Sequence, residues 1–192
     1  MPMDKPRLPP LQDHELNEAQ EENIAPFRHM GGALNVVRTM TRHPRMLKAF
    51  RGWASYVMLE TNKLLVRERE LMALRTAWLI RSDYVWSRHL AYARQAALTD
   101  EEITALKRPI DAHPWAPADL ALVRAADELV SDFFISDEAW EELNQFFDEE
   151  QITDAIFVVG HFIMMGTYLN VAGVPLDEDV SYDPDLDRFR WP

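Results

Sequence analysis

The chain has 192 residues, 47% hydrophobic and 27% charged, which is typical of a globular protein with enough apolar material for a core. Its net charge of −12 argues against binding to a nucleic-acid backbone or an anionic membrane, because both attract basic surfaces. The absence of cysteine excludes disulfides, thiolate nucleophiles and cysteine metal sites. Only 6 glycines, set against many residues that favour helices, predict an all-α protein.

Residues 1–30 are predicted to form an N-terminal arm. This segment lacks sustained apolar periodicity, and it is interrupted by Pro2, Pro6, Pro9 and Pro10. One short helix is expected near residues 13–22, and the arm should be either disordered or packed on a neighbouring subunit. Neither a secretory signal nor an apolar run long enough to span a bilayer is found, so we expect a cytoplasmic protein without a membrane partner.

A helical domain is predicted over residues 31–180, followed by a C-terminal tail over residues 181–192. Its periodicity predicts helices at residues 33–40, 44–60, 100–107, 118–134 and 137–147, two more within residues 65–98, and a long apolar helix that ends at Val171. Residues 109–117 contain three prolines and are expected to form a loop. Capping patterns start helices at Thr99 and Asp148, Pro44 suits a first helical turn, and Gly173 should end the long helix.

The stretch 65–98 carries the candidate chemistry. It is predicted to form two helices joined near residues 81–83, with Glu70 on an otherwise apolar face of the first and His89 on that of the second. A carboxyl and an imidazole directed towards a core need partners. If the two groups meet in a pocket, they form an acid–base pair.

This stretch resembles the carboxymuconolactone decarboxylase/AhpD-like superfamily. In the redox members, a glutamate is followed twelve residues later by a Cys-x-x-Cys pair and then by a histidine four residues on; laid on this chain, these positions are Glu70, Ser82, Val85 and His89. The decarboxylase-like members have a cysteine-free version similar to SDYVWSRH here. RERELMALR before the motif, AALTDEEI after it and YLNVAGVPLDED near the C-terminus also agree, and the resemblance covers roughly residues 30–180.

The resemblance implies an AhpD-like helical bundle with a central antiparallel helix pair and a homo-oligomeric state, trimer or hexamer. The central helices and the N-terminal arm are the expected interface. It also implies a lyase that removes CO2 from a small aromatic-derived lactone acid without a cofactor. Glu70 and His89 would be catalytic, and the expected substrate-binding residues are Tyr84, Trp86, Arg75 and His161, with Arg88 as an alternative to Arg75.

Structural interpretations of the same residues stay open. Glu70 could pair with a neighbouring arginine, His89 could be a satisfied core histidine, and His161 lies on a strongly apolar helix where a core role is favoured. Ser82 could cap the second central helix. A metal site built from Glu70, His89 and His161 is not expected, because no compact ligand pair occurs around them.

Two alternatives to the lyase remain. One is a catalytically silent or ligand-binding family member that keeps the scaffold and forms an oligomer. The other is a thiol-dependent peroxide reductase, which the family label suggests but which Ser82 and Val85 cannot support, since neither residue can be oxidised to a disulfide.

Overall fold

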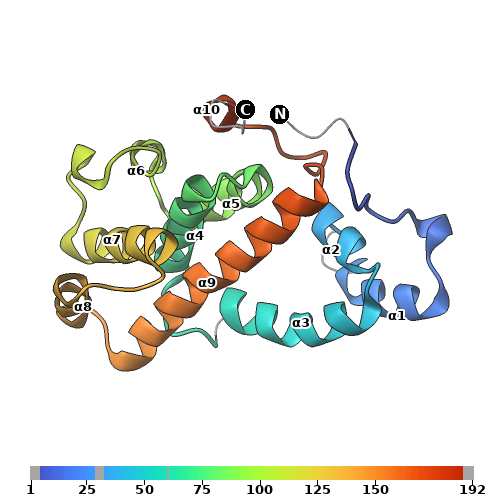
Figure 1. The fold of residues 1–192 in the computed structure, drawn as a ribbon, viewed down its shortest axis with the longest axis horizontal. Helices are drawn as coiled ribbons and strands as arrows, with labels where there is room; N and C mark the ends of the chain where they lie inside the picture. The colour runs from blue at the N-terminus through green and yellow to red at the C-terminus, as the bar shows by residue number, and fades with distance from the viewer. Residues whose placement is uncertain (1–4, 29–32, 60, 188–192) are drawn as a thin grey trace.

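The computed structural model describes residues 5–28, 33–59 and 61–187, which fold into a bundle of α-helices (Figure 1). No strand occurs among these residues, and the prediction of an all-α protein is confirmed. The described elements are η1 (Asp13–Glu15), α1 (Glu18–Arg28), α2 (Asn35–Met40), α3 (Pro44–Met58), α4 (Val66–Leu79), α5 (Asp83–Gln95), α6 (Asp100–Ala105), η2 (Ile110–Ala112), α7 (Pro117–Ser131), α8 (Asp137–Asn144), α9 (Glu149–Ala172) and α10 (Pro184–Asp187).

The helix ends follow the local signals in the sequence. Thr99 and Asp148 are N-caps whose side chains accept hydrogen bonds from the backbone N–H three residues on, and both form the predicted capping boxes. Pro44 lies in the first turn of α3, where a missing N–H costs nothing. Gly173 ends α9 with a φ of 68°, a left-handed conformation that favours glycine.

Helix α4 lies at the centre of the bundle. It packs against α5, α7 and α9, and every residue from 69 to 77 is buried. A helix covered on all sides belongs to a core, so the polar residues on α4 must find partners inside the protein. Because α5 follows after a short turn at residues 80–82, the two helices form the predicted antiparallel central pair.

Helix α9 crosses the bundle diagonally, in front of the other helices in the view of Figure 1. By length and composition it is the one helix among the described residues that could cross a membrane, with a mean hydropathy of 1.6 over an 18-residue window. Its inner side packs against α4, α5 and α7, and that side includes the buried polar residues Asp154 and His161. We therefore treat α9 as a core helix, while the cytoplasmic location stays a prediction.

The N-terminal segment differs from the expected arm. Instead of one short helix at residues 13–22, a 3-10 turn precedes α1, which begins and ends later than expected. The segment packs on its own chain, because Ile24 and Leu11 are buried and the N–H of Leu8 donates to the carbonyl of Ala172 at 3.0 Å. Residues 1–4 and 29–30 of the predicted arm lie outside the described residues, as do residues 188–192 of the predicted tail.

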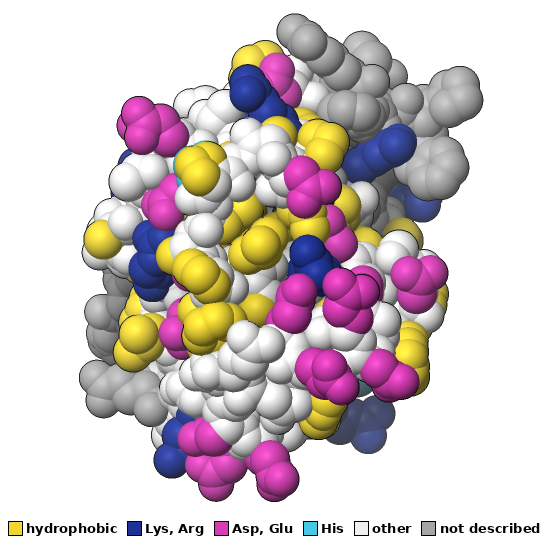
Figure 2. All heavy atoms as spheres, turned by 90° about the vertical axis from the view of Figure 1, so that its left-hand side faces the viewer, with side chains coloured by type: hydrophobic (Ala, Val, Ile, Leu, Met, Phe, Trp, Pro, Cys, Tyr) yellow, Lys and Arg dark blue, Asp and Glu magenta, His cyan; other side chains and the backbone are white. Residues whose placement is uncertain are grey.

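The described part of the C-terminal segment runs back over α5. Asp177 accepts a hydrogen bond from Tyr84, and Asp183 accepts one from the Trp86 indole. On the side of the molecule formed by α6, α7 and α8, many acidic side chains lie around a central group of hydrophobic ones, with fewer basic side chains among them (Figure 2). This surface agrees with the strongly negative charge of the chain.

Candidate active site

Glu70 and His89, which were both expected to point inward, meet inside the bundle. The Nδ1 atom of His89 lies 2.7 Å from Oε2 of Glu70, and the two residues are only 8% and 3% exposed. Glu70 stands on α4 ten residues before the turn and His89 on α5 seven residues after it, so the hairpin brings them to the same level. A carboxylate in this position accepts the hydrogen bond and assigns the proton to Nδ1, which leaves Nε2 of His89 as the free ring nitrogen.

Aromatic rings surround this pair. The ring of Phe162 on α9 stands perpendicular to the His89 imidazole, with the ring centroids 4.8 Å apart, and Tyr92 makes a second edge contact at 5.6 Å. Such rings keep water away from the pair and so strengthen the electrostatic interaction within it. Two aromatic rings therefore border the His89 side of the pair.

His161 belongs to the same cluster. Its ring stacks on Phe50 with centroids 5.7 Å apart, and it makes an edge contact with Phe162 at 5.1 Å, so Phe162 lies between the two histidines. His161 is only 5% exposed, and its Nδ1 atom has no hydrogen-bond partner among the described residues. Burial, and to a smaller degree the neighbouring His89, lower the pKa of His161 to about 4. His161 is therefore a neutral imidazole at pH 7.

Tyr84 and Trp86 hold the C-terminal segment. The Tyr84 hydroxyl donates to Asp177 at 2.5 Å and accepts from the backbone N–H of Val36, and burial raises its pKa far above the usual range. The Trp86 indole donates to Asp183 at 2.9 Å, and its ring is fully buried. The polar atoms of both side chains are used in structural hydrogen bonds, so neither is free for a substrate in this arrangement.

The two candidate arginines are also engaged in ion pairs. Arg75 forms a two-pronged ion pair with Asp127 on α7, at 2.5 and 2.7 Å, and donates to the carbonyls of Leu106 and Arg108. Five residues along a helix turn the side chain by roughly 140°, so Arg75 points away from the face that carries Glu70. Arg88 pairs with Asp177 and Asp179. The structure gives these two arginines structural roles and does not bring them to the Glu70–His89 pair.

The positions that hold cysteines in the redox relatives are closed to solvent. Ser82 is 0% exposed and Val85 is 3% exposed. Ser82 is the N-cap residue of α5, as the sequence suggested, but its side chain makes no capping hydrogen bond. The Ser82 hydroxyl lies against Gly166 of α9, and it is no candidate nucleophile.

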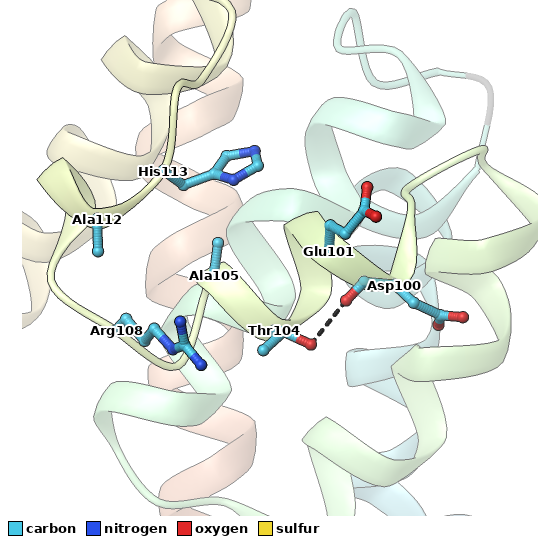
Figure 3. A pocket seen from close by; sticks show the side chains of 7 residues that line it. All are labelled: Asp100, Glu101, Thr104, Ala105, Arg108, Ala112 and His113. Atoms are coloured by element: carbon cyan, nitrogen blue, oxygen red, sulfur yellow. Dashed lines mark hydrogen bonds between the residues drawn. The ribbon is translucent and has the colours of Figure 1, made fainter.

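No group of three or more possible metal-ligating side chains occurs within the described ranges. A separate pocket with a volume of about 380 Å³ lies on α6 and the following turn. Figure 3 shows Asp100 and Glu101 on α6, with Arg108 and His113 on the chain that follows. This pocket does not include Glu70, His89 or His161, so it is separate from the pair.

Sequence reasoning missed the aromatic side of the site. Phe50 and Trp53 on α3 approach His161, and the Tyr56 hydroxyl on the same helix donates to the buried Asp154 of α9 at 2.5 Å. The signal was present as three aromatic residues spaced three apart, which fall on neighbouring positions of one helix face. Their target could not be inferred, because α9 lies about a hundred residues later in the chain.

The fold matches known structures over nearly its full length. It resembles an uncharacterized peroxidase-related protein from Ralstonia eutropha JMP134, described as an alkylhydroperoxidase AhpD core, with 19% identity, a TM-score of 0.79 and coverage of 91% of this chain and 93% of that chain. A peroxidase-related protein from Silicibacter sp. TM1040 matches with 20% identity, a TM-score of 0.77 and coverage of 92% and 96%. The debrominase Bmp8, in complex with 2,3,4-tribromopyrrole, matches with 15% identity, a TM-score of 0.72 and coverage of 98% and 97%.

These likenesses define the class of the fold, an AhpD-like helical bundle. Residues 44–128, which contain the Glu70–His89 hairpin, match the model of the carboxymuconolactone decarboxylase family. The chain therefore combines an AhpD-like fold with a central region, residues 44–128, that is similar to the carboxymuconolactone decarboxylase family. No curated protein matches the sequence.

Proposed function

We propose that this protein is a cofactor-independent lyase that acts on a small aromatic-derived lactone or carboxylic acid, with Glu70 and His89 as its acid–base pair. One observation carries the proposal, namely the 2.7 Å contact between two buried ionisable groups within an apolar surround. A buried carboxyl–imidazole pair is a costly arrangement for a core, and such pairs concentrate at functional sites. The family match of residues 44–128 supports the reaction class.

Decarboxylation of a conjugated lactone acid needs little from a protein. The bond between the ring carbon and the carboxylate breaks, CO2 leaves, and the electron pair of that bond spreads through the conjugated system onto the lactone oxygen. The developing negative charge requires a hydrogen-bond donor, and the carbanion carbon then takes up one proton. One positioned acid can supply both the hydrogen bond and the proton. No redox partner is needed, because the electron pair of the broken bond stays on the product.

His89 is the group proposed for both roles. Its Nδ1 is held by Glu70, so Nε2 is the nitrogen that would face a substrate and, when protonated, donate to the oxyanion and then to carbon. The hydrogen bond to Glu70 fixes the orientation of the His89 ring. His89 would regain its proton from solvent after the product leaves.

The neighbouring rings fit a flat conjugated substrate. Phe162, Tyr92 and Phe50 offer faces and edges on which a small ring can stack. A structural neighbour of 15% identity, the debrominase Bmp8, was solved with 2,3,4-tribromopyrrole, itself a small aromatic ring. His161, neutral and with an unused Nδ1, is proposed as a hydrogen-bonding residue for the substrate.

The test is to incubate the purified protein with γ-carboxymuconolactone and follow both lactone loss and CO2 release. We expect equal molar amounts of the two in the wild type, and loss of turnover in folded Glu70→Gln and His89→Ala variants. His113→Ala is a suitable control, because this histidine lies in the separate pocket near α6. Absence of turnover with this and related lactone acids would contradict the lyase.

The second candidate is a catalytically silent family member, which the engagement of Arg75 and Arg88 in ion pairs favours, since neither is free to hold a substrate carboxylate. It predicts that Glu70→Gln and His89→Ala change only the stability of the folded protein. A thiol-dependent peroxidase predicts hydroperoxide turnover with a dithiol reductant. We expect none, because the chain contains no cysteine.

A homo-oligomer, either a trimer or a hexamer, is also proposed. The central helix α4 is covered by α5, α7 and α9 of its own chain, so it leaves little surface for another subunit. The contact surface therefore has to come from other elements.

A further inference from the structure

The outer side of α9 carries a regular row of uncovered residues. Their spacing alternates between four and three, which is the spacing of a heptad seam. This α9 seam consists of Thr153, Phe157, Gly160, Met164, Thr167 and Val171, all exposed. A row with this spacing stays on one side of a helix and is the pattern with which two helices pair.

The α9 seam carries no charge, and its three large residues are apolar although they face solvent. Phe157, Met164 and Val171 are 50%, 49% and 56% exposed. No charged side chain occurs in residues 155–172, in a chain with 27% charged residues and a net charge of −12. The face in Figure 2, in contrast, is studded with acidic groups. Exposed apolar stretches of this kind mark interaction surfaces.

We propose that the α9 seam binds the α9 seam of a second copy of this chain, with the two helices antiparallel. In an antiparallel pair centred near residue 162, each large seam residue meets a small one. Phe157 faces the partner's Thr167, Met164 faces the partner's Gly160, and Val171 faces the partner's Thr153. Gly160 offers a real recess, because no atom of the chain lies within 4 Å of the place where a Cβ would stand.

A parallel pair is far less favourable. It would set Phe157 against Phe157 of the partner subunit, and Gly160 against Gly160 of the partner subunit. The Phe157 layer would then push the two helices apart, and the neighbouring Gly160 layer would be left with a void. Both overpacking and voids cost stability. The size pattern of the seam therefore selects the antiparallel arrangement.

The lack of charge in the seam makes it the place where a second copy can approach. Two chains of net charge −12 repel each other over most of their surfaces, so they can approach closely only where neither carries charge. An anionic bilayer would be repelled by the same charge. The proposed contact is isologous, with a two-fold axis. Of the two oligomers named above, a hexamer contains such an axis and a bare trimer does not.

Cysteine cross-linking tests the arrangement, and the native chain contributes no background because it has no cysteine. Thr153→Cys and Val171→Cys lie at the two ends of the seam and are exposed, so neither substitution opens the core. When the two variants are mixed and oxidised, we expect a disulfide-linked heterodimer. Each variant alone should stay uncrosslinked, because its two copies of the cysteine would be about 27 Å apart along the helix axis.

Cross-linking of Thr153→Cys alone, or of Val171→Cys alone, would indicate a parallel pair and overturn the proposal. A mixture that does not cross-link would overturn it as well.

A charge placed in the seam gives an independent test by light scattering. Met164→Glu should halve the mass of the wild-type oligomer or reduce it further, whereas Phe134→Glu, which removes a more exposed apolar side chain from the turn after α7, should leave it unchanged. A monomeric wild type, or dissociation by Phe134→Glu but not by Met164→Glu, would overturn the proposal. So would a monomer that cosediments with phosphatidylcholine vesicles, which would assign the seam to a membrane.

Discussion

Folding strongly alters the ionisation of His161. It is almost fully buried, it stacks on Phe50, and its pKa is lowered from 6.5 to about 4. Desolvation is the main cause, since a charged imidazole loses its water without gaining an acceptor. The residue therefore links the stability of the fold to pH.

Acidification should weaken the fold through His161. Because its pKa is lower in the folded state, the unfolded chain binds the proton first, so this contribution to stability is lost as the pH falls from about 7 towards 4. Between pH 7 and pH 5 we expect the wild type to lose about 2 kcal/mol of unfolding free energy through this residue. Urea unfolding of the wild type and of His161→Gln at both pH values measures the difference. An equal loss in the two proteins would contradict this assignment.

Arg75 shows which part of the site the sequence could not reveal. The Glu70–His89 pair was predictable because both residues lie on one hairpin, within nineteen positions of each other. Arg75, Tyr84 and Trp86 were expected to bind substrate, yet their partners Asp127, Asp177 and Asp183 lie 52, 93 and 97 positions away. Local periodicity gives the face of a helix but not which distant carboxylate will meet it.

Replacing Arg75 should damage the fold rather than the binding of a substrate. Arg75→Met would leave Asp127 and the carbonyls of Leu106 and Arg108 without their donor, at a cost of about 3 kcal/mol of unfolding free energy. The more exposed pair between Arg124 and Glu142 provides the control, and Arg124→Met should cost less than about 1 kcal/mol. Denaturant titration measures both. Similar small losses would show that Arg75 is not a structural anchor.

At the scale of helices, the residues at which a helix starts and ends were easier to predict than the partner against which each helix face packs. Capping at Thr99 and Asp148 and the stop at Gly173 depend on a few neighbouring residues, and all three are present as expected. Helix α1 was misplaced because its buried contact depends chiefly on Ile24, too little apolar material to define a period. Its stability comes from packing on the rest of the chain.

Two glycines of α9 provide a matched test of the packing on its two sides. A Cβ at Gly166 would lie 2.4 Å from Cδ1 of Ile80 and 3.1 Å from Cβ of Ser82, whereas a Cβ at Gly160 would meet nothing within 4 Å. The end of the Ile80 side chain can move but Cβ of Ser82 cannot, so Gly166→Ala should be less stable than Gly160→Ala by about 1–3 kcal/mol through overpacking. On the Met164→Glu background, where the proposed contact between two α9 seams is absent, Gly160→Ala should raise the unfolding free energy by up to about 1 kcal/mol through helix propensity. Thermal unfolding of the two variants measures both effects, and a tolerated Gly166→Ala would contradict the close approach of α9 to the α4–α5 turn.

At the scale of the whole molecule, the bundle encloses one hairpin and keeps its ionisable pair dry. Helices α7 and α9 cover α4, and aromatic rings come from α3 and α9. The C-terminal segment is hydrogen-bonded to α5. The all-α class and the central hairpin were predictable from composition and periodicity. The aromatic surround of the pair was not, since it depends on how α3 and α9 pack together.

The central claim is that Glu70 and His89 act as one catalytic unit, and a double-mutant comparison tests it most directly. The measurement is kcat/KM on γ-carboxymuconolactone for the wild type, Glu70→Gln, His89→Ala and the variant with both changes, each shown to be folded at the assay temperature. If the pair works as a unit, the double variant should lose no more activity than His89→Ala alone, because residues that act together are not additive. Four proteins with equal activity, or losses that simply multiply, would contradict a catalytic unit formed by this pair.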